Sequence, residues 1–307
     1  MESSYHIPVL YREVIEGLNI RKNCLVIDGT LGGGGHTELI LKKNNTSRVV
    51  AFDRDIEAIN FATNRLNKFG DRLSVVHSNF KNMIGVIKEK GVKADGVLLD
   101  LGVSSHQIDD PTRGFSFRFD SELDMRMDTS EELTAKDVIN NYKEEKLVRI
   151  FSEYGEERYS KRIARGIINS RPINSTGELK QTIETVVNKI NKKESASSVQ
   201  RVFQAIRIEV NHELDDLYNL IVSLPEILNK GARIAIISFH SLEDRIVKRA
   251  FNELTTDCVC PPRIPICVCG HEKKAINITR KPITASDEEL KNNSRSSCAK
   301  LRIVEII

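Results

Sequence analysis

The sequence lacks the features of a membrane protein or a secreted one. No apolar run in its 307 residues approaches the length that spans a bilayer, and the N-terminus carries neither a basic nor an apolar leader segment. It holds only six cysteines, too few for a disulfide scaffold of this length. With 40% apolar and 29% charged residues, the composition is that of a globular protein with a sizeable core. We therefore expect a cytoplasmic enzyme.

Net charge is also small, at +3, but the charges are unevenly distributed. Residues 120–157 contain 12 acidic and 5 basic side chains, whereas residues 158–207 contain 3 acidic and 11 basic ones. A basic segment of this kind is typical of proteins that contact a polyanion such as RNA. Solvated helices that form ion pairs with their acidic neighbours would explain the pattern equally well.

Four consecutive glycines lie in segment 28–36, which begins at Asp28 and ends at His36. The apolar run 24–27 precedes this segment and helix-forming residues 37–41 follow it, so the pattern predicts a strand, a tight turn and a helix. Glycine allows such a turn to adopt positive φ and to approach a ligand above the helix N-terminus. We expect a nucleotide-like ligand here, although a glycine turn can also serve only to join a strand to a helix.

Three further apolar runs, at 48–52, 73–77 and 96–100, alternate with helices expected at 38–43, 55–68 and 81–90. This alternation predicts a doubly wound, mostly parallel α/β sheet. Asp53 follows the first of these runs about 25 residues after Asp28, near the spacing at which a carboxylate binds ribose hydroxyls. Asp28, Asp53 and Asp100 would then share one edge of the sheet, where open α/β folds bind their ligands.

The alternation stops after Asp100. An N-cap at Ser130 and helical patterns at 137–154, 160–169 and 176–193 predict an all-helical insert, with residues 195–198 as the linker out of it and one long helix at 199–220. The β pattern resumes at 233–239 after a helix stop at Gly231, and a helix with Ser241 as its N-cap follows. Residues 299–307 alternate and predict a last strand at an edge of the sheet.

Nine segments, in the family's order, carry a resemblance to a known family: 6–10, 28–36, 53–55, 99–105, 113–117, 123–128, 154–158, 203–207 and 237–245. They resemble the bacterial S-adenosylmethionine-dependent methyltransferases that modify N4 of a cytosine in 16S ribosomal RNA. The segments span nearly the whole chain, which makes the resemblance specific. The chain departs from the family at Ser104-Ser105-His106-Gln107, where the family has proline in the third place, so this loop is expected to be less rigid.

The resemblance implies a Rossmann-like class I methyltransferase core formed by residues 1–107 and 205–307. An all-helical domain for RNA recognition, residues 108–204, interrupts this core after the fourth strand. The implied cofactor is S-adenosylmethionine, and the implied partner is 16S rRNA within the small ribosomal subunit. Gly34, Gly35 and His36 are implied to lie around the methionine end of the cofactor, and Asp53 is implied to bind its ribose hydroxyls. Phe80 is implied to lie beside the adenine, and Asp100 and Gln107 beside the sulfonium.

Each of these residues also has a simpler interpretation. Phe80 is an aromatic residue of the kind that usually fills a core, and His36 can merely occupy the first turn of a helix. Asp53 can be a solvated loop acid. Asp28 can orient the glycine turn by accepting its backbone N–H groups without touching a ligand.

An exocyclic cytosine amine is a poor nucleophile because its lone pair is delocalised into the ring. The enzyme must align this amine with the methyl–sulfur bond and accept hydrogen bonds from it. We expect Asp100 to be this acceptor, in addition to its role at the cofactor. His240, Ser104 and Ser105 are secondary candidates, and a histidine satisfied locally at a helix start is the favoured interpretation of His240.

Residues of the insert are candidates for RNA contacts. A target base must leave its stack to reach a buried cofactor. Phe115, Phe117 and Phe119 alternate along a loop and offer a stacking surface worth about 1 to 3 kcal/mol per base, although alternation more commonly marks one buried face. The basic residues expected to hold phosphates are Arg158, Lys161, Arg162 and Arg165.

Cys258, Cys260, Cys267 and Cys269 offer four thiols, the donor set of a tetrahedral zinc site. The Cys-x-Cys spacing is tighter than that of the usual zinc knuckle, so we assign no metal from the sequence. Two rival functions stay open as well. One is a dinucleotide-dependent oxidoreductase with the same glycine turn, and the other is a non-catalytic RNA-binding assembly factor that retains the fold. The segment after Asp100 argues against the first.

Overall fold

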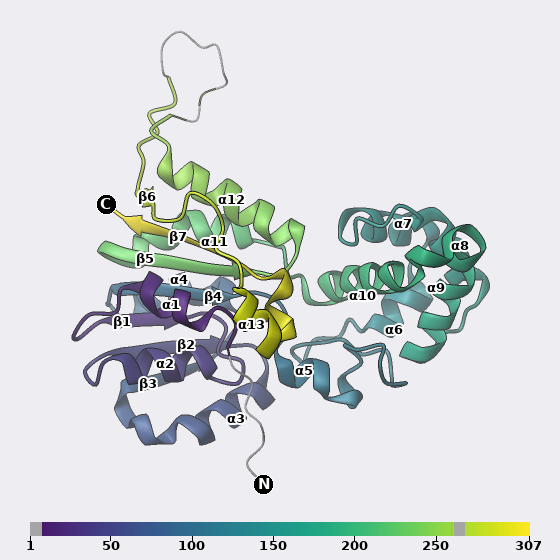
Figure 1. The fold of residues 1–307 in the computed structure, drawn as a ribbon, viewed down its shortest axis with the longest axis horizontal. Helices are drawn as coiled ribbons and strands as arrows, with labels where there is room; N and C mark the ends of the chain where they lie inside the picture. Colours follow the sequence, from purple (N-terminus) through teal and green to yellow (C-terminus); the bar gives the residue numbers. More distant parts are fainter. Residues whose placement is uncertain (1–7, 259, 261–267) are drawn as a thin grey trace. The chain divides into compact units, whose positions relative to one another are not determined.

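The computed structural model describes residues 8–258, 260 and 268–307. The chain divides into two compact units, one formed by residues 1–102 and 214–307 and the other by residues 103–213. Figure 1 shows the first unit as a sheet covered by helices and the second as a group of helices. We call them the sheet unit and the helical unit and describe each by itself.

The strands are β1 (Leu25–Asp28), β2 (Arg48–Asp53), β3 (Leu73–His77), β4 (Ala94–Asp100), β5 (Leu228–Ser238), β6 (Ala275–Asn277) and β7 (Lys300–Ile306). The helices of the sheet unit are α1 (Tyr11–Leu18), α2 (Gly35–Lys43), α3 (Ile56–Leu66), α4 (Met83–Glu89), α11 (Leu217–Ser223), α12 (Ser241–Thr255) and α13 (Asp287–Asn292). Those of the helical unit are α5 (Ser105–Asp109), α6 (Ala135–Asn141), α7 (Glu144–Glu153), α8 (Ser160–Asn169), α9 (Thr176–Asn191) and α10 (Ser195–Asn211).

Within the described residues, seven strands form one sheet in the order β3-β2-β1-β4-β5-β7-β6. The first five are parallel to one another, and β7 runs antiparallel to both β5 and β6. Buried strands with helices between them produce this arrangement because each crossover must return over a face of the sheet. The prediction of a doubly wound, mostly parallel sheet with a helical insert after the fourth strand is confirmed.

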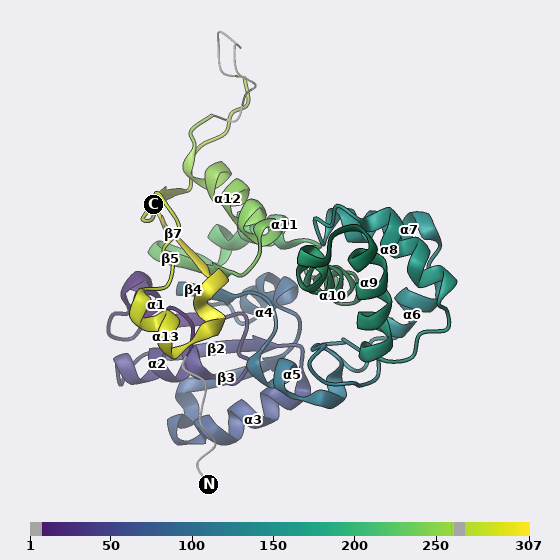
Figure 2. The same ribbon diagram turned by 45° about the vertical axis from the view of Figure 1, so that its right-hand side comes forward.

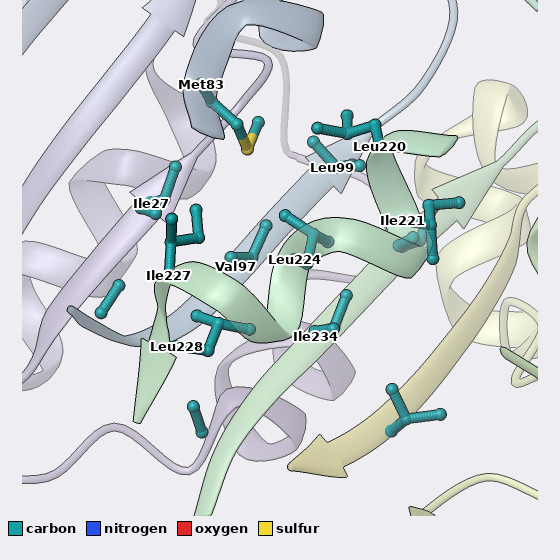
Figure 3. Close-up of a cluster of buried hydrophobic side chains, with 14 of the residues drawn as sticks. Ile27, Met83, Val97, Leu99, Leu220, Ile221, Leu224, Ile227, Leu228 and Ile234 are labelled. Carbon is teal, nitrogen blue, oxygen red and sulfur yellow. The ribbon is translucent and has the colours of Figure 1, made fainter. Parts of the chain in front are cut away.

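Two apolar clusters cover the two faces of the sheet. On one face, side chains of β1, β4 and β5 meet α4, α11 and α12, and Figure 3 shows Ile27, Met83 and Leu99 among them. On the other face, α1, α2 and α3 pack against the sheet through residues such as Val14 and Ile40. Figure 2 shows the same helices on either side of the strands. Strands β1, β2 and β4 are therefore buried on both faces, which explains their continuous apolar runs, whereas the edge strand β3 has no buried residue.

The helical unit has its own apolar core, to which α6, α7, α8, α9 and α10 all contribute. In α8, for example, Ile163, Ala164 and Ile167 are fully buried, whereas Lys161 and Arg162 are exposed. Apolar residues spaced three and four apart lie on one side of a helix. This spacing leaves the basic residues of the segment facing solvent.

Several boundaries differ from those predicted. The expected linker at 195–198 is the first turn of α10, and the expected long helix is interrupted between α10 and α11 because His212 and Asp216 adopt positive φ, which ends a helix. Gly231 stops no helix. It lies inside β5, where its φ of 80° accompanies an irregular register against β4.

Two further details of the prediction are wrong. Ser130 caps no helix, because the next helix, α6, begins at Ala135 with Thr134 as its N-cap. The last strand, β7, is not at the edge of the sheet, because the short strand β6 pairs with its outer side. Three residues are too few for β6 to show a hydrophobic period in the sequence.

Within the described residues, no helix is both long enough and apolar enough to cross a membrane.

Candidate active site

The sheet has a switch point between β1 and β4. From β1 the chain proceeds to β2 and β3 on one side, whereas β4 and β5 lie on the other side. Open parallel sheets bind ligands at the carboxyl ends of the strands that flank such a point. The last residues of β1, β2 and β4 are Asp28, Asp53 and Asp100. The structure therefore brings these three carboxylates to the edge at which a ligand is expected.

The glycine loop after β1 crosses this edge. The Leu31 N–H donates to the Phe52 carbonyl of β2 at 2.9 Å, and the Gly34 φ is 77°. A Cβ atom at Gly34 would lie 2.7 Å from Leu66 Cδ1 of α3. Only glycine therefore permits both this conformation and this close approach. The loop ends at Gly35, where α2 begins.

Asp53 holds this loop against the end of β2. Its Oδ2 accepts from the Gly32 N–H at 2.7 Å, and its Oδ1 accepts from the Asp55 N–H at 2.9 Å. Burial raises the pKa of Asp53 above its ordinary value, and the two N–H donors oppose that rise. A carboxylate oxygen can accept more than one hydrogen bond. The group is thus fixed in orientation and retains the capacity to accept from a diol.

Asp28 is fully buried, and its side chain accepts hydrogen bonds from the glycine loop and from α2. Its Oδ1 accepts from the Thr30 N–H at 3.1 Å, and its Oδ2 accepts from the Thr37 hydroxyl at 2.6 Å. Burial raises the pKa of Asp28. These contacts match the simpler interpretation of Asp28, that it orients the glycine turn.

His36 and Asp100 meet above the switch point. His36 Nε2 lies 3.5 Å from Asp100 Oδ2, and the Thr30 hydroxyl accepts from the Asp100 N–H at 2.7 Å. Among the described residues, His36 Nδ1, His36 Nε2 and Asp100 Oδ1 are buried and make no hydrogen bond. A buried polar atom without a partner costs about 1 to 3 kcal/mol. A polar ligand that supplies donors and acceptors here would remove this cost.

Phe80 begins a short 3-10 turn after β3 and is half-buried. It packs against the core on the α4 side of the sheet, together with Val76 and Ile84. A Cβ atom at Gly29 would lie 3.4 Å from Phe80 Cβ. Phe80 is therefore partly a core residue, as its simpler interpretation holds, and lies beside the start of the glycine loop.

Gln107 belongs to the helical unit, where it is buried. Its Oε1 accepts from the Ser104 N–H at 3.0 Å, and its own N–H donates to the Ser104 hydroxyl at 3.2 Å. Ser104 thus caps the first turn of α5 and fixes the Gln107 amide. The side chains of Ser105 and His106 are outside the described part of the structure.

His240 is the N-cap of α12, and its Nδ1 accepts from the Glu243 N–H at 3.4 Å. Its Nε2 lies 3.1 Å from Glu243 Oε1, and Glu243 accepts in turn from the His240 N–H. The prediction that Ser241 is the cap is wrong by one residue. His240 thus lies at a helix start, as its favoured interpretation holds, but the histidine is only partly satisfied there, because its Nε2 is buried and makes no hydrogen bond among the described residues.

Comparison with known proteins bears on this geometry. The model of the MraW methylase family matches residues 3–307. The chain belongs to this family. It is 50% identical to the ribosomal RNA small subunit methyltransferase H of Carboxydothermus hydrogenoformans, over 98% of this chain and 97% of that protein. The proteins of the same name from Fusobacterium nucleatum and Finegoldia magna are 48% and 46% identical, each over at least 98% of both chains.

One cluster at the candidate site of this methylase was not predicted. Glu38 of α2 is buried and accepts from Lys68 Nζ at 2.8 Å, lies 2.9 Å from Lys42 Nζ and pairs with Arg65. Arg65 Nη1 also donates to the Gly33 carbonyl at 2.7 Å. Burial alone would raise the Glu38 pKa, but the three cations lower it to about 2. Arg65 therefore holds the glycine loop from α3, and no local sequence pattern indicates this contact.

Thr30 and Thr37 were also missed. Both lie inside segment 28–36 or directly after it, so their place in the glycine motif was the available signal. Thr37 binds Asp28, and Thr30 binds the Asp100 backbone. These two hydroxyls connect the end of β1 to its helix and to β4.

In the helical unit, Phe115 and Phe117 pack against the helical core, and the Phe117 ring meets Phe203 edge-on at 5.4 Å. Phe119 is 45% exposed. The alternation of Phe115 and Phe117 thus marks a face in contact with the core, as is common. The basic residues predicted to hold phosphates are all exposed: Arg158, Lys161, Arg162 and Arg165. Of these, Arg165 forms an ion pair with Glu144.

Proposed function

We propose that this methylase transfers a methyl group from S-adenosylmethionine to the N4 amine of a cytosine in 16S ribosomal RNA. The observation that carries the proposal is the site itself. Carboxylates at the ends of β1, β2 and β4 converge with a glycine loop at the switch point of the sheet. The full-length relatives at 46–50% identity are named ribosomal RNA small subunit methyltransferase H, which supports the choice of reaction and substrate.

Each part of the cofactor has a chemical counterpart among these residues. Asp53 is assigned to the ribose diol because its two oxygens are held at the end of β2 by backbone donors. Phe80 is assigned to the adenine face. Gly34 and Gly35 allow close approach of the backbone at the N-terminus of α2.

The unpartnered groups of His36 and Asp100 fit the polar methionine end, which carries both an amino group and a carboxylate. His36 can donate to the carboxylate, and Asp100 can accept from the amino group. Gln107 is assigned to the same region on the strength of the family resemblance. Bound S-adenosylmethionine supplies the electrophilic methyl group on a sulfonium.

Asp100 also has the position for the acceptor of the cytosine amine. Its side chain is 27% exposed, so one side of the carboxylate faces outward while Oδ1 is buried. A carboxylate that accepts a hydrogen bond from the amine favours the pyramidal geometry of attack. A strong base is unnecessary because the nitrogen becomes acidic only after methylation. The active role of Asp100 is therefore to orient the amine and then to receive its proton.

The helical unit is assigned to the RNA. Arg158, Lys161 and Arg162 form an exposed basic group at the start of α8, suited to phosphate contacts. Phe119 is the exposed aromatic residue of the loop before α6 and is suited to stacking on an unpaired base.

The test is methyl transfer to small ribosomal subunits from cells that lack this protein, with digested RNA analysed by mass spectrometry. We expect N4-methylcytidine, and we expect none with the Asp100→Ala variant. Deproteinised 16S rRNA and assembled subunits are compared in parallel to decide which one is the substrate. A catalytically inactive protein that restores subunit assembly in those cells would instead support an RNA-binding assembly factor. Binding of NAD rather than S-adenosylmethionine would support the oxidoreductase.

A further inference from the structure

The segment between α12 and β6 brings cysteines together. Cys258 and Cys260 lie just after α12, and Cys269 lies on the returning leg before β6. The described parts of the two legs run side by side in both views (Figures 1 and 2). The Sγ atoms of these three cysteines all lie within 4.8 Å of one another. Cys267 lies outside the described residues.

The distance between two of these sulfur atoms matches that in a tetrahedral metal site, and the third lies within 4.8 Å of both. Zinc binds thiolates at about 2.3 Å, so two sulfurs of a zinc tetrahedron lie about 3.8 Å apart. Cys258 Sγ and Cys269 Sγ are 3.8 Å apart. This distance is nearly twice the length of a disulfide bond, about 2.05 Å. We propose that Cys258, Cys260 and Cys269 bind one structural Zn²⁺ ion.

The two legs need such a cross-link because they bury little apolar surface. The described residues between Thr255 and Ala275 form no helix or strand, and Val268 is 77% exposed. Contacts at the base hold the legs, where His271 Nε2 lies 2.9 Å from the Glu253 carbonyl and the Lys274 N–H donates to the Leu254 carbonyl at 2.8 Å. Ordering such a segment costs backbone conformational entropy. A metal that joins the legs offsets this cost.

The zinc is structural rather than catalytic because α12 separates it from the site. His240 caps the end of α12 that follows the carboxyl end of β5, whereas the cysteines follow its other end. A helix of 15 residues is about 22 Å long. The ion is therefore too far from Asp100 and His36 to act on a bound methyl donor.

The test measures zinc in untagged full-length protein purified without chelator and under reducing conditions. We expect about one zinc per chain by mass spectrometry of the metal. Cys258→Ser, Cys260→Ser and Cys269→Ser should each lower bound zinc at least tenfold after dialysis against a weak chelator. Cys298→Ser is the matched control, since Cys298 is also an exposed thiol but lies outside the cluster. This control should retain its zinc.

Two further measurements test the coordination of the metal and the folding of the variants. Cobalt should replace the zinc and give the intense visible and near-ultraviolet absorption of a tetrahedral cobalt thiolate, which the triple serine variant lacks. Binding of S-adenosylmethionine, at the other end of α12, should persist in that variant and shows that it is folded. Absence of zinc after reconstitution, zinc that survives the triple substitution, or a Cys258–Cys269 disulfide in protein isolated without oxygen would each overturn the proposal.

Discussion

His36 Nε2 lies 3.5 Å from Asp100 Oδ2, so the first residues of α2 and the last residue of β4 form one polar pair at the switch point of the sheet. The glycine motif supplies one partner and the fourth strand supplies the other. Buried atoms of both residues lack hydrogen bonds among the described residues. A pair placed in this way is suited to a ligand rather than to stability alone.

Asp100→Asn should lower kcat for methyl transfer by about 100-fold or more, the usual contribution of a positioned proton acceptor. The affinity for S-adenosylmethionine should change far less, because the amide keeps the size of the side chain and one acceptor oxygen. Single-turnover kinetics and calorimetric binding separate these two effects. Asp71→Asn, an exposed position, is the control and should leave both quantities unchanged. Equal losses in binding and turnover would show that Asp100 serves the cofactor only.

Asp53→Ala should weaken binding of S-adenosylmethionine by about 10- to 100-fold, as expected when a charged hydrogen-bond acceptor is removed. Only the ionised carboxylate accepts from both ribose hydroxyls. Because burial raises the pKa of Asp53, affinity should fall on acidification at a higher pH than for an ordinary aspartate. Calorimetric titrations across the acidic range measure this dependence. Unchanged affinity in Asp53→Ala would show that Asp53 does not bind the ribose hydroxyls.

Gly34→Ala should destabilise the protein by about 1 to 3 kcal/mol and abolish cofactor binding. The φ of 77° is strained for alanine, and the new Cβ would meet Leu66 at 2.7 Å. Gly85→Ala in α4 is the control. Apart from its chain neighbours and the backbone of α4, no atom lies within 4 Å of a Cβ added at Gly85, and alanine in a helix should raise stability by about 0.5 to 1 kcal/mol. Urea unfolding measures both variants, and a Gly34→Ala protein of wild-type stability would contradict this account.

Glu38→Gln should lower the free energy of unfolding by about 1 to 2 kcal/mol at neutral pH, a discounted value since Lys42 and Lys68 are about half exposed. The folded pKa of Glu38 is about 2, below its ordinary value of 4.5. The stabilisation that ionised Glu38 provides is therefore complete above pH 4.5 and is lost as the pH falls towards 2. Urea unfolding at several pH values should show the two proteins converging over this window. A constant difference would mean that ionisation of Glu38 is not the cause.

Arg158→Glu combined with Arg162→Glu should weaken binding of 16S rRNA and reduce the slope of log K against log salt by about one to two units. Both side chains are exposed, so the fold should be unaffected. Lys143→Glu, an exposed cation in the acidic segment, is the matched control and should bind as the wild type does. Filter binding at several salt concentrations provides the measurement. An unchanged slope would show that the basic segment is a solvated surface that does not contact the RNA.

The parts of the structure that the sequence predicted well are those with local physical causes. Strands β1, β2 and β4 were found because strands inside a parallel sheet are buried on both faces and require apolar runs. The glycine loop was found because positive φ and close packing demand glycine. Errors arose where long-range pairing decides the outcome, as at β7, which lies inside the sheet only because β6 pairs with its outer side.

The same division holds for the candidate site. Asp28, Asp53 and Asp100 could be identified from the sequence because each follows an apolar run. The support of the glycine loop by Arg65 could not be identified, since its partners Gly33 and Glu38 lie far away in the chain. The short distances between the three thiols could not be predicted either, because spacing along the chain does not give the distance between two legs of a loop.

The sequence by itself determined the alternation of strands and helices, the glycine turn, the acidic strand ends and the family to which the chain belongs. These features are written in local residue patterns, which depend on backbone geometry and hydrophobic period. The tertiary structure alone decided that His36 meets Asp100 and that Arg65 and Glu38 fix the loop. It also brought Cys258 and Cys269 to 3.8 Å. Contacts between distant segments depend on how the whole core packs, and no short window of sequence contains that information.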